Sequence, residues 1–176
     1  MLPVRYLKNI FTRKPAATGG PTAAGDEPRI ISEVREMIIE NTVAAAMCHD
    51  FDEDLVMETI ADHTGVSRGR IFQSVKRVND ILPHELTGQY DLKTRLIRAA
   101  TTTASLLLSG ASRGEIESRL VGEGLFSPKT PNLASATVSR IEALSPEDRR
   151  KLAALGECGV DFLLKEIIRA EKKEDL

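Results

Sequence analysis

Aromatic residues and cysteines are scarce in this 176-residue chain. Only 4% of the residues are aromatic, tryptophan is absent, and the two cysteines, Cys48 and Cys158, lie far apart. This cysteine usage excludes a disulfide framework and favours a reducing compartment. With so few aromatic residues, the core must consist mainly of Leu, Ile, Val and Ala. Such a composition, without strand-like alternation of useful length, predicts an all-α protein.

Long apolar runs are also missing. No stretch approaches the roughly 20 apolar residues that span a bilayer, and the N-terminus lacks the continuous apolar core of a secretory signal. Residues 1–14 are basic and acid-free, which is typical of a flexible arm and also of a mitochondrial presequence. We expect no membrane association and a cytoplasmic location.

Recognisable catalytic and metal-binding patterns are absent. The three histidines, His49, His63 and His84, have no accompanying nucleophile pattern, and no CxxC or HxxxH spacing occurs. The glycine-rich stretches lack the Lys-Ser/Thr ending of a phosphate-binding loop. We therefore expect a protein that is not an enzyme and that uses no metal or cofactor.

The chain has no global positive charge, since its formal net charge is −2. Any affinity for nucleic acid must therefore come from a local patch. Residues 30–90 carry five basic and eleven acidic side chains, yet residues 67–78 within them contain four basic residues and no acid. The four are Arg68, Arg70, Lys76 and Arg77. A short basic segment on an acidic body suits binding to the phosphates of DNA.

Residues 59–78 have the pattern of two helices joined by a tight turn. Gly65 permits a left-handed turn conformation, and Ser67 is a favoured N-cap for the helix that follows. Ile71 and Val75, four residues apart, share the inward face of this second helix. The pattern indicates a helix-turn-helix DNA-binding unit, and the alternative is an ordinary helical corner with a glycine at its end.

Residues 42–82 resemble the DNA-binding part of TetR-type regulators. The family's pattern is carried by Ile60-Ala61, Gly65-Val66-Ser67, Gly69 and Ile71-Phe72, while Val75 replaces the family's usual aromatic residue. The resemblance implies DNA binding and, in that family, a ligand-responsive effector domain. Only about 95 residues follow residue 82, and few aromatic residues are available to line a pocket. We therefore expect no small-molecule effector.

The second helix of this unit is predicted to read double-stranded DNA. Contacts with base edges are assigned to Arg68, Arg70 and Gln73. Contacts with the phosphate backbone are assigned to Lys76 and Arg77. Ser67 is expected to cap the helix and to touch a phosphate near the N-terminal amides.

The chain is predicted to comprise three parts. Residues 1–29 form a basic arm and linker, residues 30–88 the DNA-binding domain, and residues 89–176 a helical dimerisation domain. The arm interpretation of residues 1–14 is preferred over a presequence because the motif downstream has bacterial character.

Start and stop signals place the individual helices. The predicted helices of the first domain cover residues 30–48, 53–64 and 67–80, and a longer helix over 91–109 starts at Asp91. Later signals are a capping box at Ser112–Glu115, a start at Ser145-Pro146, and a bend or split at Gly156 and Gly159.

Residues 112–144 resemble a second DNA-binding unit, the helix-turn-helix of large serine recombinases. In this reading Ile116 and Leu120 lie on the first helix, residues 126–133 form a Pro-containing loop, and Ser135 begins the second helix. The candidate DNA contacts are Lys129, Thr130, Ser135, Ser139 and Arg140. The alternative, a packed helical pair within a dimerisation domain, is favoured because acidic residues dilute the positive field.

The leading hypothesis is a sequence-specific transcription regulator of the nucleoid, with repression favoured, acting as a homodimer. One short helix reads only a few base pairs, and natural operators are often two-fold symmetric. The alternative is a DNA-recruiting subunit of a phage or mobile-element machine, such as a small terminase subunit or a conjugation accessory protein.

Overall fold

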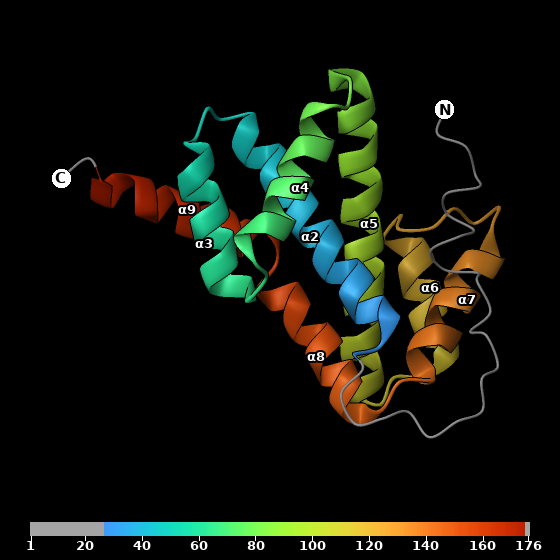
Figure 1. Ribbon diagram of the computed structural model, residues 1–176. Coiled ribbons are helices and arrows are strands. Elements are labelled where there is room, and N and C mark those ends of the chain that lie inside the picture. The colour runs from blue at the N-terminus through green and yellow to red at the C-terminus, as the bar shows by residue number, and fades with distance from the viewer. Residues whose placement is uncertain (1–26, 175–176) are drawn as a thin grey trace. The chain divides into compact units, whose positions relative to one another are not determined.

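The computed structural model describes residues 27–174, and over this range the protein is all-α (Figure 1). This confirms the predicted fold class. The helices are α2 (Arg29–Met47), α3 (Glu53–Thr64), α4 (Arg68–Asn79), α5 (Pro83–Leu108), α6 (Arg113–Gly122), α7 (Pro131–Glu142), α8 (Pro146–Glu157) and α9 (Val160–Glu174). Within the described range, none of them is both long enough and apolar enough to cross a bilayer. The predictions for the basic arm and most of the linker, residues 1–26, lie outside the described residues.

The described chain forms two compact units, and their boundaries fall inside helices. Unit 1 contains the described residues up to Glu33 together with Arg98–Ala154. Unit 2 contains Val34–Ile97 and the described residues from Leu155 onward. Each unit is therefore assembled from two separate stretches of sequence.

The predicted domain boundary between residues 88 and 89 does not coincide with this division and stays a prediction. One contribution to the division comes from α9, which packs against α3 within unit 2. Ile167 of α9 is fully buried in the core cluster of unit 2, and Leu164 packs against the same cluster. Burying these two side chains places the C-terminal helix with residues 34–97 because apolar area is removed from water there.

The first three helices begin and end close to where the sequence predicts. Asp52, just before α3, supplies the N-terminal cap of that helix. Its carboxylate accepts a hydrogen bond of 2.9 Å from the backbone N–H of Leu55. Glu53 and Asp54 follow in the first turn, where negative charge is favourable toward the helix dipole.

The predicted start of the next helix at Asp91 is wrong, since α5 begins at Pro83. Proline is well suited to a first helical position because its missing N–H would have no intrahelical partner there. Glu85 adds a favourable charge to that first turn. Gly88 is accommodated inside the helix, so Asp91 becomes an exposed interior residue.

The later start and stop signals are confirmed. The capping box at α6 is complete: the Ser112 hydroxyl accepts from the Glu115 N–H, and the Glu115 carboxylate accepts from the Ser112 N–H at 2.7 Å. The hydrogen bond from the Ser112 backbone N–H, and after it the interaction of the Ser112 hydroxyl with the carboxylate, lower the pKa of Glu115. α8 begins at Pro146, and the predicted split near Gly159 separates α8 from α9.

The glycine in the turn, Gly65, leads to a prediction about stability, and Gly69 provides the control. Gly65 has a φ of 68°, and a Cβ built there meets no atom within 4 Å. Gly65→Ala should therefore lose about 1–2 kcal/mol of stability through backbone strain alone. Gly69, inside α4, has equally open space, so Gly69→Ala should gain about 0.5–1 kcal/mol.

Urea unfolding followed by far-UV circular dichroism measures both changes. A Gly65→Ala variant as stable as Gly69→Ala would show that the left-handed turn is not what requires glycine at residue 65.

Candidate nucleic-acid interface

A turn of three residues joins α3 to α4. Gly65 adopts the predicted left-handed conformation at the end of α3, and its N–H donates to the carbonyl of Ala61 at 2.9 Å. The N–H of Val66 donates to the Thr64 hydroxyl at 3.3 Å. Ser67 occupies the predicted N-cap position with extended backbone, but its side chain makes no capping hydrogen bond. The turn therefore falls at the predicted residues, the predicted capping hydrogen bond of Ser67 is not formed, and the helix-turn-helix assignment stays a prediction.

One side of α4 is buried in the core of unit 2. Ile71 is 0% exposed, Val75 is 2% exposed, and Val78 also belongs to the core cluster. The cluster joins them to Ile60 of α3 and Val43 of α2. This burial fixes the rotation of α4 about its axis, and so decides which side chains reach solvent.

The other side of α4, together with the N-cap residue before it, carries the residues of the first unit that are predicted to contact DNA. All six are exposed: Ser67, Arg68, Arg70, Gln73, Lys76 and Arg77. Phe72, 38% exposed, lies among them. The Lys76 ammonium sits over its ring, 5.0 Å from the centroid, in a cation–π contact. The structure therefore brings the predicted residues to one exposed side of one helix.

Three of the basic side chains of α4 have acidic partners on the neighbouring helices. Arg68 pairs with Asp54 of α3 at 2.8 Å. Arg70 pairs with Glu36 of α2. Both pairs are largely open to solvent, where ion pairs contribute little to stability. These carboxylates hold the guanidinium groups that are predicted to reach base edges.

The third pair is built differently. Arg77 pairs with one carboxylate oxygen of Glu40 at 2.8 Å, while the Lys93 ammonium pairs with the other at 2.6 Å. Arg77 also donates to the hydroxyl of Ser74, a buried residue, at 3.1 Å. Glu40 is thus held between α4 and α5, and it holds Arg77 in turn.

Sequence reasoning did not identify the two glutamates of α2. Glu36 and Glu40 lie four residues apart, so they share one face of that helix. This spacing was the available signal, but the partner of that face depends on how α2 packs against α4.

The second candidate unit, α6 and α7, differs from its prediction at the loop. α7 begins at Pro131, so Ser135 lies in the second turn of the helix rather than at its start. The predicted loop over residues 126–133 is too long, because proline is favourable at a first helical position and the helix already begins at Pro131. Lys129 is exposed in the loop that precedes α7.

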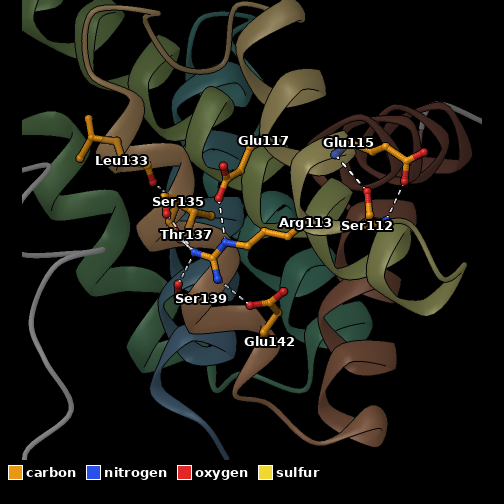
Figure 2. Close-up of polar contacts among 9 residues, drawn as sticks. All are labelled: Ser112, Arg113, Glu115, Glu117, Leu133, Ser135, Thr137, Ser139 and Glu142. Atoms are coloured by element: carbon orange, nitrogen blue, oxygen red, sulfur yellow. Dashed lines mark hydrogen bonds and ion pairs between the residues drawn. The ribbon is translucent and has the colours of Figure 1, made fainter.

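Arg113 of α6 engages two of the predicted DNA contacts of this second unit (Figure 2). Its guanidinium donates to the Ser135 hydroxyl and carbonyl at 2.9 Å and to the Ser139 hydroxyl at 2.6 Å. Glu117 and Glu142 accept from the same group, each at 2.9 Å. Arg140 pairs with Glu33 at 3.1 Å. The contacts of Arg113 join α6 to α7 within unit 1, whereas the pair between Arg140 and Glu33 joins α7 to α2. DNA contact by this unit stays a prediction.

A pocket of about 250 Å³ lies within unit 2, beside the end of α2 and the start of α3. Its lining residues are Val43, Met47, Asp50, Phe51, Glu53, Val56 and Val75. This volume is below the roughly 300–1,000 Å³ that is usual for small-molecule sites. The expected lack of a small-molecule effector stays a prediction.

Comparison with known proteins does not place the chain in a family. No family model matches it, and no solved structure matches it. It is 27% identical over 124 residues to small ribosomal subunit protein uS5 of Thermotoga petrophila and, equally, of Thermotoga sp. strain RQ2. The match covers 68% of this chain and 66% of those proteins. The fold and the site therefore define a class, an all-α protein with an exposed basic helix, and no particular family.

Proposed function

We propose that this protein is a sequence-specific DNA-binding transcription regulator that reads DNA with α4. The observation that carries the proposal is the two-sided character of that helix. Its apolar side is buried in unit 2, while the predicted DNA contacts are exposed on the other side. No acidic residue occurs within Arg68–Asn79, so α4 itself contributes only positive charge toward a DNA phosphate backbone.

The dimensions of α4 suit a major groove. Twelve residues at 1.5 Å each make a helix about 18 Å long, and its diameter of about 10–12 Å with side chains fits a major groove about 12 Å wide. Arg68, Arg70 and Gln73 lie toward the N-terminal part of α4, where recognition helices contact base edges. Arginine pairs with guanine and glutamine with adenine through two hydrogen bonds each. Lys76 and Arg77, farther along, would bind backbone phosphates.

The proposal includes a homodimer that represses transcription. A single short helix reads only a few base pairs, whereas a two-fold dimer reads two half-sites about one helical turn apart. A dimer bound across a promoter would cover that DNA, and the proposal therefore favours repression over activation. The resemblance of residues 42–82 to TetR-type regulators supports the same reading.

The test compares two double variants. Arg70→Ala with Lys76→Ala removes one proposed base contact and one proposed phosphate contact, and should weaken binding at least tenfold, since a specific base contact contributes about 1–3 kcal/mol. Arg95→Ala with Lys165→Ala removes the same charge from exposed positions on α5 and α9, and should change affinity about twofold at most. Gel shifts at physiological salt measure both, on duplexes that the wild-type protein selects from a random library.

Equal affinity of the two double variants would contradict the assignment of α4 as the reading helix. Mass measurement in the same preparation tests the dimer, because a ring of about eight subunits or more would favour the DNA-recruiting subunit of a packaging machine. The two similar proteins belong to the small ribosomal subunit, so cosedimentation with that subunit, without selection of any duplex, would favour a ribosomal role.

A further inference from the structure

The two glutamates of α2 contact the arginines of α4 in different ways. Glu36 and Arg70 are both well exposed, with 46% and 60% of their side chains accessible. Glu40 is only 17% exposed, and its second partner, Lys93, is 13% exposed. One carboxylate is therefore an open surface partner, while the other is a half-buried anchor.

The exposed pair can exchange its partner. Contact of Arg70 with a DNA phosphate or base weakens its pair with Glu36, because the carboxylate and the DNA compete for the charge of the same guanidinium and no second group among the described residues anchors Arg70. This competition is independent of DNA sequence. Glu36 therefore lowers affinity for any duplex.

The half-buried carboxylate cannot move with the same ease. Lys93 holds one oxygen of Glu40 at 2.6 Å, and the other oxygen holds Arg77 at 2.8 Å. The buried Ser74 hydroxyl, at 3.1 Å from the same guanidinium, fixes it from a second direction. A guanidinium has five N–H donors, so Arg77 keeps donors for a phosphate while it stays in place. A side chain that is already ordered loses less conformational entropy on binding.

We propose that Glu36 is an intramolecular competitor of DNA and that Glu40 is a positioning residue, which orients Arg77 toward a backbone phosphate. The inference rests on the proposed function. Glu36 and Glu40 then have opposite effects on the affinity for DNA, although both are negative charges on one face of α2. Net charge alone would give the two residues the same effect on affinity.

The test neutralises each acid in the full chain and measures binding to a random-sequence duplex by fluorescence anisotropy at about 0.1 M salt. Glu36→Gln should bind about two- to fivefold more tightly, the range of a surface ion pair. Glu40→Gln should bind the duplex at least about threefold more weakly than the wild-type protein. Glu58→Gln, at an exposed position of α3, is the matched control and should leave affinity within about twofold of wild type.

Double variants separate positioning from a general structural effect. Glu40→Gln should cause no further loss in an Arg77→Ala background, and Glu36→Gln should cause no gain in an Arg70→Ala background. A structural role of Glu40 would instead weaken binding in both the wild-type and the Arg77→Ala backgrounds.

Three outcomes overturn the inference. Tighter binding by both Glu36→Gln and Glu40→Gln would reduce Glu40 to a repulsive charge. In the second outcome, Glu36→Gln and Glu40→Gln both bind with wild-type affinity, while the double variant Arg70→Ala with Lys76→Ala binds more weakly. This result would overturn the inference and leave the proposed function standing. If none of the α4 variants lost affinity for DNA, both this inference and the proposed function would be overturned.

Discussion

Replacement of Ile71 by alanine is expected to lower the free energy of unfolding by about 2–5 kcal/mol. Ile71 is 0% exposed and lies in one core cluster with Ile60, also 0% exposed, and Val75. Alanine would leave a cavity among α2, α3 and α4, and the lining side chains would lose their dispersion contacts. Because the same burial orients α4, the proposed function predicts that the variant also loses affinity for DNA beyond what instability explains.

The next residue along the helix provides the control. Phe72 is 38% exposed and contacts Lys76 rather than the core, so Phe72→Ala should lose less than about 1 kcal/mol. Urea unfolding followed by circular dichroism measures both variants. If Ile71→Ala and Phe72→Ala lost equal amounts of stability, the assignment of the buried and exposed sides of α4 would be wrong.

Replacement of Arg113 by alanine should destabilise unit 1 by about 1–3 kcal/mol. Its guanidinium contacts two glutamates and two serines, and these partners lie on both α6 and α7 (Figure 2). The value is well below the sum of the separate hydrogen bonds because the side chain is 42% exposed, and water replaces part of each contact. Arg113→Lys should recover little, since an ammonium lacks the planar fork of donors.

Arg119 on the same helix is the matched control. Its closest ion pair is with Glu123, four residues along, at 2.7 Å, and it makes no recorded bond to α7 among the described residues. Arg119→Ala should therefore lose at most about 0.5 kcal/mol. Thermal unfolding of Arg113→Ala and Arg119→Ala measures the two losses of stability. If Arg119→Ala lost as much stability as Arg113→Ala, the contacts between α6 and α7 would not be the cause of the loss at Arg113.

The sequence predicted those features of the fold that depend on neighbouring residues. The left-handed Gly65 and the capping box at Ser112 are both confirmed, and the cap at Asp52 is a local feature of the same kind. Each involves hydrogen bonds or backbone angles within about four residues, so tertiary packing has little power to override it. The exposed side of α4 was predictable for the same reason, since the spacing of Ile71 and Val75 defines the buried side.

Local signals failed where two of them competed. Pro83 and Asp91 both have the chemistry of a helix start, and the sequence contains no term that ranks them. The same holds for α7, where Pro131 rather than Ser135 begins the helix. In both places the earlier signal prevailed and the helix extended toward it.

By itself, the sequence determined that the protein is all-α, where most helices begin and end, and which side of α4 is polar. Only the tertiary structure decided that α9 packs with the N-terminal helices, that Glu36 and Glu40 meet the arginines of α4, and that Arg113 joins α6 to α7. The first group rests on interactions between residues close in the chain. The second rests on contacts such as that between Arg113 and Glu142, where residues far apart in sequence meet because apolar faces pack together. The hydrophobic effect that drives this packing has no preferred direction, so the charge partners follow from the shapes of the packed helices rather than from any spacing along the chain.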